Sequence, residues 1–147
     1  MRPGTAAAKI MTPSTPPAAF AFKLRVYWED TDAGGVVFYA NYLKFFERAR
    51  TEWLRSLGFE QETLRRDHGL MFIVTDTSLS YRRPARLDDS LDVTARLLEL
   101  RKASLRIAQQ AWRSAELLTD GTIRLACVDA ASFKPRPLPS LLMQSLG

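Results

Sequence analysis

Two aspartates and two glycines lie close together in this sequence, directly ahead of a long amphipathic segment. The run Asp30-Thr31-Asp32 follows the strand-like residues Val26–Trp28, and Gly34-Gly35 comes next. Asp favours turns, and glycine lets the backbone approach a ligand closely. A helix that begins near residue 40 would present unpaired N–H groups and the positive end of its dipole to the same place. This combination suits chemistry on a carbonyl group, because N–H groups hold an oxyanion while a carboxylate attacks the carbon or activates water. The alternative reading is a purely structural strand–turn–helix corner.

Few other side chains could carry catalysis. Cys127 lies in an apolar run, where a buried structural thiol is the usual state, and His68, the only histidine, lies in a polar turn. One histidine and one cysteine offer no zinc site. The sequence also lacks the G-x-S-x-G elbow of α/β-hydrolases, a P-loop and a dinucleotide fingerprint. Catalysis is therefore expected to use carboxylates, backbone amides and water, with no metal or cofactor.

Hydrophobic periodicity predicts the elements that position the acidic turn. Apolar residues recur at three- and four-residue steps over 40–57, which predicts a long amphipathic helix that ends at Gly58. The pattern of 60–67 predicts a short helix. Strand patterns occupy 20–28, 71–81, 91–100, 104–113 and 117–133, the last bent near Asp120-Gly121 and ended by Pro135, Pro137 and Pro139. One long helix followed by strands with short connections predicts an antiparallel α+β sheet wrapped round the helix.

One charged residue falls within the apolar face of the long helix. Arg50 lies in this face, and Glu47 precedes it by one turn, within reach on the same surface. We interpret the two residues as a partly buried ion pair. The alternative interpretation makes Glu47 a second active-site carboxylate.

Length and composition indicate a single globular domain. The chain has 147 residues, of which 46% are hydrophobic and 25% are charged. Segment 1–19 is rich in Pro, Ala and Thr, which predicts a flexible tail rather than a signal peptide, ahead of a domain over 20–140 and a tail over 141–147. No apolar run reaches the roughly 20 residues of a membrane span. The net charge is +5, but the basic residues are scattered among acidic ones without a nucleic-acid-binding motif, so anionic ligands such as the phosphates of coenzyme A, or an acidic carrier protein, fit at least as well as nucleic acid.

Five motifs carry a resemblance to a known family. They are Asp30–Tyr42, Glu47–Glu52, Pro84–Asp89, Cys127–Asp129 and Lys134–Pro139. In this order they resemble the 4-hydroxybenzoyl-CoA thioesterase family of hotdog-fold enzymes, most closely its Tol-Pal-associated acyl-CoA thioesterase branch. The resemblance runs from about Phe22 to Pro139. It implies a hotdog fold, in which a five-stranded antiparallel sheet wraps a long central helix. It also implies a homo-oligomer, either a dimer or a tetramer, with active sites at the dimer interface.

The resemblance assigns roles to individual residues of the turn. Asp32 matches the family's catalytic carboxylate and would act from the partner's side of the interface as nucleophile or general base. The backbone N–H of Tyr39 would hold the thioester oxygen, and Gly34, Gly35 and Val36 would line the approach. Hotdog dehydratases and hydratases use a histidine with a carboxylate. The absence of a histidine near the acidic turn therefore favours a thioesterase.

Four basic residues in polar connections are candidates for binding the phosphates of coenzyme A: Arg82, Arg83, Lys134 and Arg136. A solvated basic face is the alternative reading. The implied function is hydrolysis of short- or medium-chain acyl-CoA to free acid and CoA in the bacterial cytoplasm, with acyl carrier protein as a further partner. The alternative function is a non-catalytic module that binds acyl thioesters or acyl carrier protein.

Overall fold

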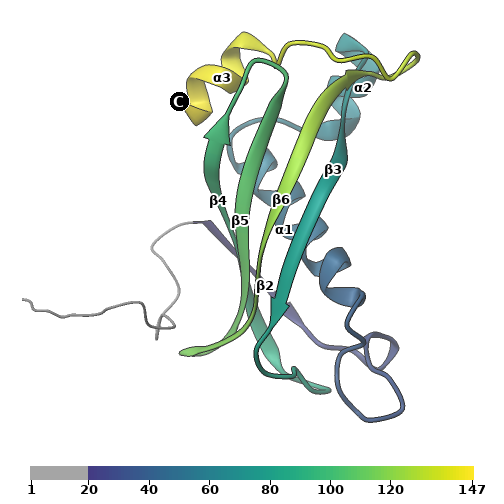
Figure 1. Ribbon diagram of the computed structural model, residues 1–147, viewed down its shortest axis with the longest axis vertical. Helices are drawn as coiled ribbons and strands as arrows, with labels where there is room; N and C mark the ends of the chain where they lie inside the picture. The colour runs from purple at the N-terminus through teal and green to yellow at the C-terminus, as the bar shows by residue number, and fades with distance from the viewer. Residues whose placement is uncertain (1–19) are drawn as a thin grey trace, which may run out of the picture.

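The computed structural model describes residues 20–147, which form one five-stranded sheet and three α-helices (Figure 1). The elements in chain order are β2 (Phe20–Arg25), the 3₁₀ turn η1 (Trp28–Asp30), α1 (Asn41–Ser56), α2 (Gln61–His68), β3 (Leu70–Tyr81), β4 (Ser90–Leu100), β5 (Ser104–Arg113), β6 (Glu116–Asp129) and α3 (Ser140–Leu146). The predicted long helix, short helix and five strands are all present. The predicted flexible tail, residues 1–19, lies outside the described residues.

The sheet is antiparallel throughout, in the order β2-β4-β5-β6-β3. Figure 1 shows α1 lying against one face of the curved sheet, with the other face turned toward the viewer. Strands β2 and β3 are the two edges. This arrangement, a long central helix wrapped by a five-stranded antiparallel sheet, confirms the α+β hotdog fold expected from the sequence.

Helix α1 is held against the sheet by the apolar face that its sequence predicts. The residues buried on this face are Tyr42, Phe45, Phe46, Ala49, Arg50, Trp53 and Leu54. They pack against inward-facing strand residues such as Val93 and Ile107, which are fully buried. The chain leaves the helix at Gly58, whose φ of +92° is costly for residues with a side chain. The buried face therefore fixes the position of the helix, including its N-terminal end beside the acidic turn.

Arg50 is buried, as its position in the apolar face predicts, but its predicted partner is wrong. Its Nη1 donates to Oε1 of Gln109 at 3.1 Å, and Nε2 of Gln109 donates to the carbonyl oxygen of Phe46 at 3.0 Å. Burial lowers the pKa of Arg50, and the charge of Glu47 partly opposes this shift. The Glu47 side chain is exposed and accepts a hydrogen bond from Thr51 at 2.8 Å. A glutamine on a strand distant in sequence thus takes the place that the helix pattern assigned to Glu47.

Two strands end earlier than predicted, because an aspartate stops each of them. After β2, the carboxylate of Asp30 accepts the Tyr27 N–H at 2.8 Å and closes η1. After β6, the carboxylate of Asp129 accepts the N–H groups of Ala131 and Ser132 at 3.0 and 2.8 Å, which lowers the pKa of Asp129. Such aspartate turns compete with a strand ladder for backbone N–H groups.

Strand β6 continues through Gly121, which lies against β3. A Cβ atom at this position would come within 2.5 Å of the Ser78 carbonyl oxygen. The glycine therefore serves close packing of the two strands.

The end of the chain differs from the predicted tail. Residues 140–146 form α3, and Leu142 is fully buried in the main core. Short apolar tails give little periodic signal, so only the packing of Leu142 distinguishes this helix from a loose end.

Candidate active site

The acidic turn is a closed hairpin that leads from η1 to α1. The N–H of Asp32 donates to the Val36 carbonyl at 2.9 Å, and the N–H of Phe38 donates to the Asp30 carbonyl at 3.0 Å. An isolated bridge between Thr31 and Val37 lies between these two bonds. Gly35 has a φ of +78°, which a residue with a side chain rarely adopts. The hairpin therefore has a defined shape, with Asp32 near its tip.

The structure separates the two aspartates of the turn. Asp30 is buried, its carboxylate bonds the Tyr27 N–H, and its carbonyl oxygen accepts Nδ2 of Asn41 at 2.8 Å. Asp32 is exposed, and its Oδ1 accepts the Gly34 N–H at 2.8 Å. Its other carboxylate oxygen has no hydrogen-bond partner within residues 20–147. Asp30 is thus used by the fold, whereas Asp32 keeps an oxygen available for chemistry.

Unpaired backbone N–H groups lie where the hairpin meets α1. The N–H of Val37 donates to the Ala85 carbonyl at 2.8 Å, and the N–H of Asn41 donates to the Phe38 carbonyl at 2.8 Å. Between them, the N–H groups of Tyr39 and Ala40 have no acceptor among the residues that the structure describes. They lie at the positive end of the α1 dipole, which is the geometry that binds a developing oxyanion.

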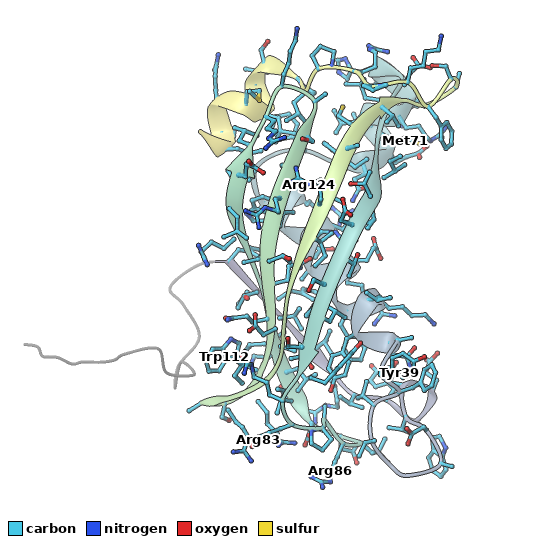
Figure 2. All side chains as sticks on the ribbon, in the orientation of Figure 1. Tyr39, Met71, Arg83, Arg86, Trp112 and Arg124 are labelled. Carbon is cyan, nitrogen blue, oxygen red and sulfur yellow. The ribbon has the colours of Figure 1, made fainter. Side chains whose placement is uncertain are left out.

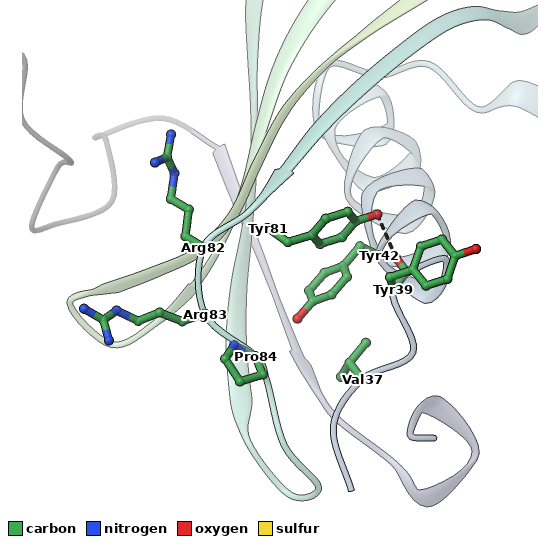
Figure 3. Close-up of a pocket in the computed structure, with 7 residues that line it drawn as sticks. All are labelled: Val37, Tyr39, Tyr42, Tyr81, Arg82, Arg83 and Pro84. Carbon is green, nitrogen blue, oxygen red and sulfur yellow. Dashed lines mark hydrogen bonds between the residues drawn. The ribbon is translucent and has the colours of Figure 1, made fainter. Parts of the chain in front are cut away.

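A pocket of about 250 Å³ opens beside Tyr39. Its lining residues, shown in Figure 3, are Val37, Tyr39, Tyr42, Tyr81, Arg82, Arg83 and Pro84. The Tyr81 hydroxyl donates to the Tyr39 carbonyl oxygen at 3.0 Å, and its ring contacts Tyr42 with a centroid distance of 5.6 Å. Burial, followed by the neighbours Tyr39 and Tyr42, raises the pKa of Tyr81. Tyr81 therefore remains a protonated donor at neutral pH.

Sequence reasoning treated Tyr81 only as the end of a strand and missed its contact with Tyr39. The available signal was a tyrosine placed directly before the Arg82-Arg83-Pro84 connection. Buried or half-buried tyrosines usually find a partner for the hydroxyl group, so this position was a candidate for a polar contact.

Arg82 and Arg83 lie at the rim of this pocket. Arg82 pairs with Asp120 at 2.9 Å, and Arg83 pairs with Glu116 at 3.3 Å. In Figure 3 both guanidinium groups point away from the three tyrosines. Exposed ion pairs of this kind are weak, so the two arginines can exchange these partners for a ligand.

Lys134 and Arg136 lie at the opposite end of the sheet from the Tyr39 pocket. They follow β6, where the Ala130 N–H donates to the Gly69 carbonyl at 2.8 Å and thus sits beside the start of β3. Arg136 pairs with Asp129 at 2.9 Å. A single chain therefore brings Arg82 and Arg83 to the Tyr39 pocket but does not bring Lys134 and Arg136 there.

The remaining reactive side chains lie outside this pocket. Cys127 is fully buried in the core, and burial raises the pKa of its thiol, while Arg136 opposes the shift. His68 is exposed at the end of α2. Within residues 20–147, no three His, Cys, Asp or Glu side chains cluster as metal ligands do. None of the helices in this part of the chain combines the length and the apolarity that crossing a membrane requires.

Comparison with known proteins identifies the family. Residues 26–146 match the family model described as the thioesterase-like superfamily. The chain is 46% identical over 120 residues to the acyl-CoA thioesterase YbgC of Haemophilus influenzae, covering 82% of this chain and 88% of that protein. It is 31% identical to the acyl-CoA thioesterase YbgC of Helicobacter pylori strain 26695, covering 85% and 98%. The crystal structure of a probable thioesterase from Bartonella henselae superposes with a TM-score of 0.78 at 36% identity, covering 81% and 98%.

The fold and these matches define the class of protein as a hotdog-fold thioester hydrolase. The chain belongs to the thioesterase-like superfamily, in agreement with the resemblance that its motifs carry.

Proposed function

We propose that this protein hydrolyses acyl-CoA thioesters of short or medium chain length to the free acid and CoA. The observation that carries the proposal is the pair of unpaired N–H groups at Tyr39 and Ala40, which lie beside an apolar pocket. The hairpin that precedes them in sequence carries the exposed carboxylate of Asp32. The modest pocket volume of about 250 Å³ supports a short acyl chain. The names of the relatives, acyl-CoA thioesterase and acyl-CoA thioester hydrolase, support the CoA ester as substrate.

In the proposed reaction, the thioester oxygen accepts a hydrogen bond from the Tyr39 N–H, so the carbonyl carbon becomes more electrophilic. Asp32 then takes a proton from a water molecule as it adds to that carbon, or Asp32 itself adds and forms an anhydride that water later opens. In both routes the C–S bond breaks and the CoA sulfur leaves as a thiolate. Because a thiolate is a good leaving group, neither route requires a strong general acid.

Asp32 and the Tyr39 N–H of one chain lie apart on the hairpin. Asp32 pairs with Val36 across the hairpin, and Tyr39 lies three residues beyond Val36, so at about 3.3 Å per residue the two positions are roughly 10 Å apart. A carboxylate that attacks the carbonyl carbon, or activates the water that does, has to lie closer to the N–H that holds the carbonyl oxygen. This separation supports the Asp32 of a partner subunit as the source of the carboxylate, as the family resemblance implies.

The open edge of β3 supports a homodimer. Residues 74–78 of this strand are all exposed, and edge strands pair readily with another strand. A two-fold, antiparallel pairing of β3 with a second β3 would place the start of one strand beside the end of the other. The partner's Lys134 and the partner's Arg136 would then approach Arg82 and Arg83 of this chain. Such a dimer would unite the four basic residues proposed to bind CoA phosphates.

This proposal also covers partners and location. Acyl carrier protein carries its acyl group as a thioester on a phosphate-linked arm, so the same basic residues and pocket would suit it as an alternative donor. We infer a cytoplasmic location, where acyl-CoA and acyl carrier protein are found.

The test is release of free thiol from a panel of acyl-CoA substrates, from acetyl to palmitoyl and including benzoyl, with wild type and Asp32→Asn compared side by side. Turnover that prefers short or medium chains and is lost in Asp32→Asn is the expected result. Turnover that persists in Asp32→Asn would remove Asp32 from the mechanism. No release from any substrate would instead support the non-catalytic binding module, with acyl carrier protein as the next ligand to measure.

A further inference from the structure

A row of four charged residues crosses the sheet on the face opposite α1. Glu99 of β4 pairs in register with Arg106 of β5, which pairs with Arg124 of β6, which pairs with Asp76 of β3. Their strand neighbours Ile107 and Ile123 point the other way and are buried in the core. Figure 2 shows Arg124 in the upper half of the sheet, whereas Tyr39 and Arg83 lie toward the lower end.

Positive charge and hydrogen-bond donors are in excess along this row when Arg101, which follows β4 and also pairs with Glu99, is counted with it. The carboxylate of Glu99 is shared by three arginines, with distances of 3.0 Å to Arg101, 3.1 Å to Arg124 and 3.7 Å to Arg106. The only other acid in the row, Asp76, is 4.0 Å from Arg124, and its side chain is 77% exposed. Three guanidinium groups therefore face two carboxylates, one of which is largely in water.

Arg106 is the arginine of this row that has a donor without a hydrogen-bond partner. Its Nε is buried and lies 3.7 Å from Oε1 of Glu99, too far for a hydrogen bond, and it has no other partner among the described residues. The side chain as a whole is 40% exposed, so its guanidinium group is accessible from solvent. A buried N–H without a protein acceptor is costly and rare in native proteins, and such a group commonly donates to a bound anion or a water molecule instead.

Arg106 and Arg124 border a hollow of about 430 Å³ on this face. The other lining residues are Asp76, Thr77, Ser78 and Thr122. The hydroxyl groups of Ser78 and Thr122 point to the same face, since these residues pair in register with each other next to the Asp76–Arg124 pair. Guanidinium groups bind phosphate through parallel N–H bonds, and hydroxyl groups supply further donors. The hollow thus offers what a tetrahedral oxyanion requires, with two opposing charges: Asp76 among its lining residues, and Glu99, which is not a lining residue but contacts both arginines.

We propose that this hollow is a phosphate-binding site, separate from the Tyr39 pocket, with Arg106 and Arg124 as its principal ligands. The ligand is inorganic phosphate or the terminal phosphate of a phosphomonoester such as a nucleotide. The site shares no residue with the pocket proposed for catalysis, so it stands independently of the proposed function.

The test is titration of the full-length protein with inorganic phosphate at constant ionic strength. Binding is measured by calorimetry and by the shift in the thermal unfolding temperature. Arg106→Gln removes the unpaired donor, and Arg106→Lys keeps the charge but loses the planar fork. Arg96→Gln is the matched control, because Arg96 is an exposed arginine on the same face, directly opposite Ala108, without an ion pair among residues 20–147. A second titration with adenosine monophosphate distinguishes a free phosphate from a phosphomonoester.

We expect wild type and Arg96→Gln to bind phosphate equally, Arg106→Gln to bind about tenfold more weakly or not at all, and Arg106→Lys to fall between them. Thioesterase turnover should be the same in all four proteins. Equal phosphate binding in wild type and Arg106→Gln would overturn the proposal. The proposal would also be overturned if the wild type bound no phosphate and Arg106→Gln had a lower oligomer mass. That result would instead make the row of charged residues a contact between copies of the chain.

Discussion

The hydroxyl group of Tyr81 donates a hydrogen bond of 3.0 Å to the carbonyl oxygen of Tyr39, and so joins the end of β3 to the start of α1. That carbonyl belongs to the same peptide group as the Ala40 N–H, one of the unpaired donors. The bond therefore sets the orientation of this peptide group and restricts rotation at Tyr39. Since preorganised donors stabilise a developing oxyanion, we infer that Tyr81 is a positioning residue, which holds the Ala40 N–H in place as a second donor next to the Tyr39 N–H.

Replacing Tyr81 with Phe should lower kcat about five- to tenfold with little change in KM, because one neutral hydrogen bond contributes about 1 kcal/mol. Steady-state kinetics on the best substrate of the panel measures the effect. Tyr39→Phe is the matched control, because it removes a hydroxyl group from the same pocket but leaves both backbone groups of residue 39 in place. Equal losses in the two variants would show that the Tyr81 hydroxyl has no specific role.

The two aspartates of the hairpin should separate activity from stability. Asp32→Asn should reduce turnover about 10²- to 10⁴-fold, as loss of an essential base or nucleophile commonly does, while the free energy of unfolding changes by less than about 0.5 kcal/mol. Asp30→Ala should instead destabilise the fold by about 1–3 kcal/mol, since it leaves the N–H of Tyr27 without its acceptor. Thiol release and urea unfolding of both variants measure the contrast. A marked loss of stability in Asp32→Asn would argue against its assignment as a free catalytic group.

A mixed dimer tests whether Asp32 and the Tyr39 N–H of one active site come from two subunits. Tyr39→Pro removes the backbone N–H, and Asp32→Asn removes the carboxylate. If the site is shared, a mixed dimer of the two inactive variants contains one intact site and should recover up to about half of the wild-type activity, by counting sites. Co-expression with two different affinity tags isolates the mixed species, and circular dichroism checks that Tyr39→Pro is folded. Recovery no greater than the activity of either parent would place both groups in the same chain.

Cys127 should be chemically inert in the folded protein. Burial raises the pKa of its thiol above the ordinary value, so less of it is thiolate at any given pH, and the thiolate is the reactive form. At pH 8 its reaction with a disulfide reagent should be roughly 10²-fold slower than that of glutathione and should become fast in denaturant, because unfolding restores both access and the ordinary pKa. Cys127→Ser should keep its thioesterase activity. Rapid labelling of the native protein would contradict the buried position.

Local patterns were sufficient for most of the fold. The steps of three and four residues in α1 and the alternation in β5 each reflect one buried face, and Gly58 marks the end of the helix through its own backbone preference. The identities of long-range partners were harder to predict. Arg50 was expected to meet Glu47, one turn away, but meets Gln109, which is 59 residues away in sequence. Sequence spacing indicates which residues lie next to each other on a helix. Packing of the helix against the sheet decides which residue a buried side chain contacts.

The sequence by itself determined the family and the acidic hairpin with its glycines, because these depend on residue types at short separation. It could not decide which aspartate of the hairpin is used by the fold and which stays free, nor that Tyr81 anchors residue 39. Those outcomes require the end of β3 and the start of α1 to occupy fixed positions in space. The tertiary structure provides these positions, since the buried face of α1 locks the helix to the sheet and thereby brings together groups that lie forty-two residues apart.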